Sequence, residues 1–285
     1  PAFSDPMQIS YDPQLQESTA SVVRVNHETV RFVAYLGFWI MVLSAVVTTT
    51  LFVDVDFDKT PLMAMFGYNN ICVYWDFVPA KYVAALIFPF AELAFLVYLG
   101  LGYAHARSSA AMGRISKLHL RIATVLFPVT VVLVAFTRMI FVVDAAVDIR
   151  GHTYGFLSLQ TALWLIAAQN AVYYDAIDKE PARRYFVKAS ETTVRIIHYS
   201  YLALFTAVTG LKLTHTLLLF FNDGVSFIDP TTPSGARAAQ ALDTAWMLLA
   251  AFVPAFLALS QRRFVRPLVI SWHLQEPQSN YETAA

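Results

Sequence analysis

Charged residues are scarce in this chain of 285 residues, since Asp, Glu, Lys and Arg make up 14% of it. An ordinary soluble domain has about 25%. Hydrophobic residues make up 57%, and 20 basic residues balance 20 acidic residues. Binding to nucleic-acid phosphates needs a basic surplus, which this chain lacks. The composition therefore argues against a nucleic-acid partner and predicts a polytopic membrane protein whose first partner is the lipid bilayer.

Other absences narrow the function. Cys72 is the only cysteine, which excludes an intramolecular disulfide and a cysteine-ligated metal or iron–sulfur site. Residues 1–23 contain no Lys or Arg, which is typical neither of a secretory signal nor of a transit peptide. The sequence also lacks a Gly-rich phosphate loop, a Gly-flanked nucleophile serine and a helical His-Glu metal pair. We therefore predict a non-enzymatic protein with no catalytic residues and no metal site.

Long hydrophobic runs are what the chain has in place of these motifs. A helix that spans a bilayer needs about 20 apolar residues, and six segments meet this requirement. Because lipid cannot satisfy backbone polar groups, we expect all six to be helices. The predicted fold class is an all-α bundle of six transmembrane helices. The predicted spans are about 32–53, 82–104, 118–143, 153–174, 196–221 and 241–260.

Lys and Arg residues are unevenly distributed between the connections. Most of them lie before the first span, in the second and fourth connections, and after the last span. Loops rich in Lys and Arg stay on the cytoplasmic side, so both termini are predicted on the inner side. This gives a polar N-terminal segment (1–31), a transmembrane domain (32–260) and a polar C-terminal tail (261–285). The predicted location is a plasma or organelle membrane, with termini on the cytoplasmic or matrix/stromal side.

The first outer connection, "DVDFDKTPLMAMFGYNNICVYWDFVPAK", is rich in aromatic and methionine residues. A solvated loop has no need of so many large apolar side chains. We expect this connection to lie in the outer interface or to pack on the mouth of the bundle.

Glu92 lies near the middle of the second span, about ten residues from either end. A carboxyl group at that depth either stays protonated or pairs with a cation. Ionisable residues within spans usually face the bundle interior and mark functional sites. The functional hypothesis is that Glu92 binds a proton or a cation at the midplane. The alternative is a structural Glu92 that bonds to a neighbouring helix.

Lys212 and His215 lie on one side of the fifth span, because residues three apart on a helix are neighbours. Arg138, Asp144 and Asp148 end the third span on the outer side, and Asp243 begins the sixth span there. These six residues are predicted to form an outer layer with charges of both signs. The layer is either the entrance to a site for a polar solute or a set of interhelical pairs. For Lys212 alone, a third interpretation is that its side chain reaches outward to the interface.

The histidines suggest a different hypothesis. His119 and His198 lie near the inner boundary, while His152 and His215 lie toward the outer one. Two cross-helix histidine pairs are the axial ligands that two stacked b-type haems need. No further sequence motif supports haem ligation.

Three functions follow from these patterns. The leading one is a channel- or transporter-like protein that moves a small ion, a proton or a polar solute, with Glu92 as its midplane site. The second is an accessory or assembly subunit that contacts other membrane subunits or forms a homo-oligomer. The third is a di-haem electron carrier, with haem b as its cofactor.

Overall fold

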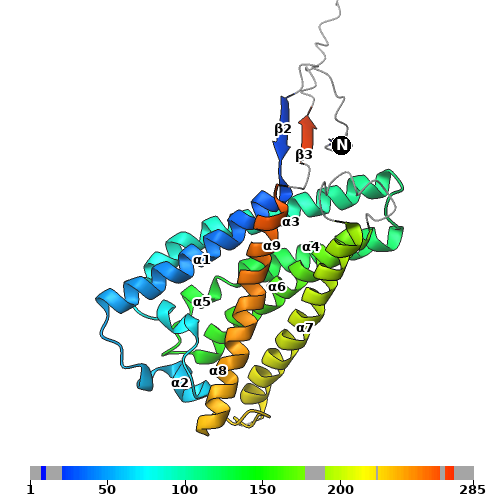
Figure 1. Ribbon diagram of the computed structural model, residues 1–285. Coiled ribbons are helices and arrows are strands. Elements are labelled where there is room, and N and C mark those ends of the chain that lie inside the picture. The colour runs from blue at the N-terminus through cyan, green and yellow to red at the C-terminus, as the bar shows by residue number, and fades with distance from the viewer. Residues whose placement is uncertain (1–7, 11–20, 177–189, 223, 264–266, 273–285) are drawn as a thin grey trace, which may run out of the picture.

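A computed structural model of the chain describes residues 8–10, 21–176, 190–222, 224–263 and 267–272. It is a mostly helical bundle, as the sequence predicts (Figure 1). The long helices are α1 (His27–Phe52), α3 (Ala80–Ala111), α4 (Lys117–Phe136), α6 (Ile149–Ala176), α7 (Glu191–Phe221), α8 (Pro233–Met247) and α9 (Val253–Gln261). The short helical elements are η1 (Phe57–Lys59), α2 (Pro61–Phe66), η2 (Ile71–Trp75), α5 (Met139–Val142) and η4 (Leu248–Phe252).

Five stretches of helix in the described residues are long and apolar enough to cross a membrane. They are His27–Phe52, Ala80–Ala111, Lys117–Val142, Thr192–Phe221 and Pro233–Gln261. The helix α6, which corresponds to the predicted fourth span, is long enough but is not among them. Its amides Gln160, Gln169 and Asn170 make it less apolar than the others.

Polar caps explain why several helices begin before the predicted spans. Asn26, Ser116 and Ser190 lie immediately before α1, α4 and α7, and each accepts a hydrogen bond from the backbone N–H three residues later. Such caps satisfy N–H groups that have no partner inside the helix. These helices therefore begin where a capping side chain is available, one to five residues before the apolar run.

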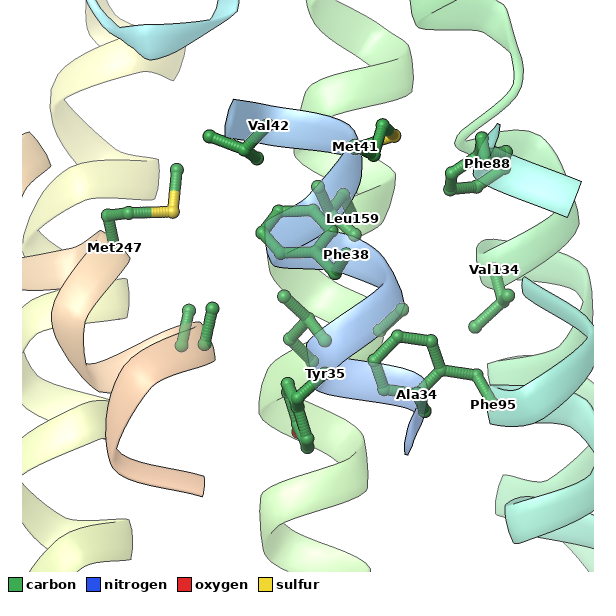
Figure 2. Packing of buried hydrophobic residues seen from close by; sticks show 14 of the residues in the cluster. Ala34, Tyr35, Phe38, Met41, Val42, Phe88, Phe95, Val134, Leu159 and Met247 are labelled. Atoms are coloured by element: carbon green, nitrogen blue, oxygen red, sulfur yellow. The ribbon is translucent and has the colours of Figure 1, made fainter. Parts of the chain in front are cut away.

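The central core lies where α1, α3, α6 and the last helix meet. In Figure 2 the α1 side chains Tyr35 and Phe38 lie between Met247 on one side and Phe95 on the other. At the crossing of α1 and α3, a Cβ atom added to Gly37 would lie 3.2 Å from the Cβ of Ala91. The absence of a side chain on Gly37 therefore lets the two helices approach closely, as small residues do in membrane bundles.

The last helix is continuous from Pro233 to Gln261 but contains a π-helical turn, η4, between α8 and α9. Pro254 follows this turn and has no N–H to donate to the preceding turn. The hydroxyl of Tyr201 on α7 donates a hydrogen bond of 2.8 Å to the carbonyl oxygen of Leu249. This bond holds α7 against the π-helical turn.

Segments from the two ends of the chain form a small antiparallel sheet. Its strands are β1 (Gln8–Ser10), β2 (Ser21–Val25) and β3 (Leu268–Trp272), in the order β1-β3-β2. In the register of β2 with β3, Val23 pairs with Ile270. Figure 1 shows β2 and β3 side by side, beyond the end of the bundle where α1 begins and α9 ends. We call this the inner end, and the end that holds α2 and η2 the outer end.

Candidate functional site

Glu92 on α3 is paired with Arg138. The Nε and Nη2 atoms of Arg138 both donate to the same oxygen of Glu92, at 2.9 and 2.7 Å. The Glu92 side chain is 3% exposed, whereas that of Arg138 is 61% exposed. Glu92 therefore bonds to a cation from the turn between α4 and α5, and not to Lys212 or His215.

Lys212 on α7 is paired with Asp243 on α8 by a close contact between its ammonium group and the carboxylate. Both residues are buried, at 4% and 6% exposed. The Lys212 ammonium also lies 5.3 Å from the ring centre of Phe156 and 5.5 Å from that of Trp246. Aromatic faces attract a cation at such distances. Lys212 therefore lies inside the bundle, and its side chain does not reach the outer surface.

The other predicted outer residues belong to separate contacts. The Nδ1 of His215 lies 2.8 Å from the hydroxyl oxygen of Ser226, beside the ring of Phe227. Asp144 is half exposed, and its carboxylate lies 4.0 Å from the ammonium of Lys81. Asp148 accepts a hydrogen bond from the backbone N–H of Gly151. The predicted outer layer is thus divided into separate contacts, and Lys212 and Asp243 are the two predicted members that form an ion pair among the described residues.

A histidine–aspartate pair lies at the outer end of α6. The Nδ1 of His152 lies 3.1 Å from the carbonyl oxygen of Val143, and a carbonyl can only accept, so Nδ1 carries the proton. The Nε2 of His152 lies 3.5 Å from a carboxylate oxygen of Asp76, which directly follows η2. Burial raises the pKa of Asp76 to about 7, although Lys81 opposes this and Asp144 adds to it.

A small cavity lies at this outer end. We call it the outer cavity, and it has a volume of about 20 Å³. Its wall includes Tyr68, Cys72, His152, Gln160, Lys212 and Thr216. Burial raises the pKa of the Tyr68 phenol and of the Cys72 thiol, so both are protonated at neutral pH. The wall therefore presents hydroxyl, amide, imidazole and ammonium groups in an otherwise apolar bundle.

A larger cavity, of about 80 Å³, lies toward the inner end, between α3, α4 and α6. We call it the inner cavity, and its wall includes His27, Tyr98, His105, His119, Gln169 and Asn170. Tyr98 donates a hydrogen bond to Asn170, and Gln169 donates one of 2.8 Å to Thr130. Within the part of the chain described here, no group of three or more His, Cys, Asp or Glu side chains is placed to hold a metal ion.

The helix α6 forms part of the wall of both cavities. Gln160 is its last residue at the outer cavity and Ile166 its first at the inner cavity. Six residues correspond to about 9 Å along a helix axis. Between them, Ala162 and Leu163 are buried in the hydrophobic core. An apolar layer therefore separates the two cavities.

Of the four predicted haem ligands, only His119 and His152 are in the wall of a described cavity. His119 is in the wall of the inner cavity and its Nδ1 lies 2.7 Å from the Ser116 hydroxyl, but His198 is not part of that wall. The Nδ1 of His198 lies 2.8 Å from the Val194 carbonyl oxygen. His152 is in the wall of the outer cavity, and His215 is not. Neither cavity is lined by both members of a predicted axial pair.

Three features of these sites are missing from the sequence-based predictions. Asp76 lies in the aromatic connection, where its position next to Trp75 was a weak signal for a buried carboxylate. Gln160 is in the wall of the outer cavity, and the available signal was an amide within an otherwise apolar run. At the inner end, Glu28 and Arg31 form a buried pair of 2.6 Å, and their spacing of three residues on a helix was the available signal.

Comparison of the chain with protein-family models, with curated proteins and with solved structures gives no match, so its function is inferred from its own residues and geometry.

Proposed function

We propose that this chain is a membrane protein with six spans and both termini on the inner side, and that it passes a small ion, a proton or a polar solute across the membrane. The observation that carries the proposal is the pair of cavities along α6, one toward each end of the bundle, each with several polar side chains in its wall. Sites built between helices near the middle of a bundle are the usual arrangement in transporters.

The terminal sheet supports an even number of spans. The strand β2 precedes the first spanning helix and β3 follows the last, and the two pair directly through backbone hydrogen bonds. Paired strands lie on the same side of a membrane. An odd number of crossings would place β2 and β3 on opposite sides, so α6 is proposed as the sixth span beside the five more apolar ones.

The packing of α6 accounts for its lower apolarity. Its side chains are largely buried against other helices, including Leu159, Ala162, Leu163 and Ile166. Polar residues in a spanning helix are tolerated where they face protein or a cavity instead of lipid. Gln160 and Gln169 both line cavities. The amides of α6 therefore lie where a membrane helix can carry them.

The basic connection between α3 and α4 supports the inner placement of the termini. It carries Arg114, and the adjoining helix ends carry Arg107 on α3 and Lys117 on α4. Figure 1 shows this junction of α3 and α4 at the same end of the bundle as the terminal sheet. Short connections rich in Lys and Arg stay on the cytoplasmic or equivalent side. The sheet and both termini are accordingly proposed on that side.

Glu92 remains a proposed transport group, now as the partner of Arg138. It lies about 18 Å along α3 from Ala80, taking 1.5 Å per residue. A neutral glutamine in its place could still bond to Arg138 but could not exchange a proton. We expect Glu92→Gln to lower the flux. If the flux is unchanged, Glu92 is a structural partner of Arg138.

The proposal is tested by measuring flux into liposomes that contain the purified protein. The probes are protons, followed with a trapped pH-sensitive dye, and the ions Na⁺ and K⁺. Gln160→Leu and Gln169→Leu each remove a polar side chain from a cavity wall. We expect either variant to lower the flux at least about fivefold, since a buried polar group contributes about 1–3 kcal/mol. Gln240→Leu, at an exposed position on α8, is the matched control and should have wild-type flux. Wild-type flux no greater than that of empty liposomes for every probe would contradict the proposal.

One observation favours the second hypothesis, an accessory subunit. The Arg138 side chain is 61% exposed, and its bond to Glu92 places it within the membrane-spanning part of the bundle. The nearby α3 side chains Phe90 and Leu93 are exposed and apolar, as lipid-facing side chains are. A charged side chain that faces lipid is costly. A partner subunit or a second copy of this chain that covers Arg138 would remove this cost. Recovery of the protein only in a stoichiometric complex, with no flux alone, would favour this function.

A further inference from the structure

Two buried side chains in the wall of the outer cavity have polar atoms that need a hydrogen-bond partner. His152 is 2% exposed and Gln160 is 1% exposed, and both are part of its wall. Among the described residues, the Oε1 of Gln160 and the Nε2 of His152 have no hydrogen-bond partner. Buried polar groups of this kind are normally satisfied by protein or by ordered water.

The volume and the polar groups of the outer cavity fit one water molecule. A buried water molecule needs roughly 10–15 Å³ and two to four polar groups, and the outer cavity has about 20 Å³. Gln160 Oε1 accepts hydrogen bonds, and the ammonium of Lys212 donates them. One water molecule therefore fits both the volume and the donors and acceptors of the wall.

The positive charge of Lys212 argues against a metal cation in the same place. Lys212 is in the cavity wall, and its own counter-ion is Asp243. A second cation beside it would be repelled at close range in a medium of low polarity. A proton carried by a carboxyl group adds no such charge, because protonation makes the carboxylate neutral.

The Asp76–His152 pair is placed to hold that proton. His152 carries its own proton on Nδ1, so its Nε2 presents a lone pair toward Asp76. A protonated Asp76 carboxyl can donate to this lone pair. The other charged groups that act on Asp76 are Lys81 on α3 and Asp144 before α6, which lie 4.0 Å from each other.

The outer cavity is lined by one residue of each charged pair. His152 and Lys212 are in its wall, and their partners Asp76 and Asp243 lie behind them, outside the wall. The Cys72 thiol, which is also in the wall, is subject to the charges of Asp243, Asp76 and Lys212. A molecule bound in the outer cavity therefore lies beside a residue of each pair.

We propose that the outer cavity is a proton-binding site, in which Asp76 and His152 share the proton and one water molecule connects them to Gln160 and to the Lys212–Asp243 pair. This rests on the proposed function and names the proton as the species taken up. On uptake, the Asp76 carboxylate gains one proton from the outer solvent and forms an O–H bond directed at His152 Nε2. On release, this bond breaks and the proton leaves with no other change in bonding.

Infrared difference spectroscopy of the purified full-length protein tests this site without any transport. Between about pH 5 and about pH 9, we expect a carboxylic-acid band to disappear with a midpoint near 7, the pKa of Asp76. The band should be missing in Asp76→Asn. It should shift to a lower midpoint in His152→Gln, because the glutamine amide can donate to the carboxylate. Asp56→Asn, at an exposed position, is the matched control and should leave the band unchanged.

Gln160→Leu tests the water connection. Loss of the amide removes an acceptor for the bridging water, so the carboxylate loses solvation and the midpoint should rise. A band that persists in Asp76→Asn, or a midpoint unchanged in both His152→Gln and Gln160→Leu, would overturn the site. If the band behaves as expected but liposomes show no flux, the proton-binding site stands and the proposed function fails. If there is proton flux but no titrating band, the proposed function stands and this site is wrong.

Discussion

At the scale of single residues, the buried charges of the bundle occur next to an opposite charge or an aromatic ring. Lys212 has Asp243, Glu92 has Arg138 and Arg31 has Glu28. A buried charge left alone costs several kcal/mol, whereas a matched pair removed together is often neutral. The pairs therefore differ sharply in their response to single and to double substitution.

Asp243→Ala should be strongly destabilising, because it leaves the ammonium of Lys212 buried without its carboxylate. We expect a loss of about 3–5 kcal/mol in the free energy of unfolding. The double variant Lys212→Met, Asp243→Leu should recover most of it. The measurement is unfolding in mixed micelles by titration with a denaturing detergent.

The matched control is Lys59→Ala, which breaks the exposed pair of Lys59 with Asp56. Exposed pairs contribute little, so the change should stay within about 1 kcal/mol. If Asp243→Ala is no more destabilising than Lys59→Ala, the buried pair does not stabilise the outer end of the bundle.

Asp76 should make stability depend on pH. Its pKa is raised to about 7 in the folded protein from the ordinary 3.8, so the folded state binds the proton more tightly than the unfolded state. Stability should therefore fall as the pH rises from about 4 to about 7, by at most about 4 kcal/mol. Asp76→Asn cannot ionise and should remove this fall.

The measurement is the Tm of wild type and Asp76→Asn at about pH 5 and about pH 8. The Tm of the variant should exceed that of wild type by more at about pH 8 than at about pH 5, because most of the fall lies between these pH values. An equal loss of Tm at both pH values would mean that Asp76 acts through packing and not through its charge.

At the scale of helices, glycines set how closely α6 approaches its neighbours. A Cβ atom added to Gly155 would lie 2.7 Å from the backbone nitrogen of Ile140 in α5. Backbone cannot move aside as the end of a side chain can. The outer half of α6, which carries His152 and Gln160, is thus positioned by the close contact of Gly155 with α5.

Gly155→Ala should therefore destabilise the bundle, by about 1–3 kcal/mol, as overpacking does in a close-packed interior. The matched control is Gly210→Ala on α7, where a Cβ atom would meet no atom within 4 Å. Alanine favours a helix over glycine, so Gly210→Ala should cause no loss. Both are measured by detergent unfolding, and equal effects of the two variants would contradict the close contact.

The contact between α7 and the π-helical turn depends on one hydroxyl. Tyr201→Phe keeps the ring and removes the hydrogen bond to the Leu249 carbonyl oxygen. We expect a loss of about 1–3 kcal/mol in the free energy of unfolding, because that carbonyl then lies near the core without this donor. Tyr82→Phe, on an exposed face of α3, is the control and should change stability little. A Tyr201→Phe variant as stable as this control would show that the turn holds without the hydroxyl.

At the scale of the whole molecule, the sequence predicts the helical bundle well because hydrophobic length is a local property. The predicted spans agree with the helices to within a few residues at most ends, and α3 extends further inward, to Ala111. The pairing of charges is not local. Glu92 and Arg138 are 46 residues apart and Lys212 and Asp243 are 31 apart, so their partners depend on how the helices pack.

The residues at the outer cavity also show that contacts between distant parts of the chain are hard to predict from the sequence. His152 and Lys212 could be chosen from the sequence because ionisable groups in apolar segments stand out. Asp76 stands out far less, since its burial arises only when the aromatic connection packs against α6. The pairing of β2 with β3 joins residues from opposite ends of the chain and has no local signal at all.

The central claim is that α6 crosses the membrane, so that its two cavities face opposite sides. It is tested most directly by introducing one cysteine at a time and labelling it in intact cells with a reagent that cannot cross membranes. The positions are Asp58→Cys before α3, Met112→Cys after α3 and Val225→Cys after α7, all exposed. Wild type is the control, because its one thiol, Cys72, is buried. We predict that Asp58→Cys and Val225→Cys are labelled from outside and that Met112→Cys is not. Labelling of Asp58→Cys with protection of Val225→Cys would place α7 in the opposite direction, and a six-span bundle with two opposed cavities would then be wrong.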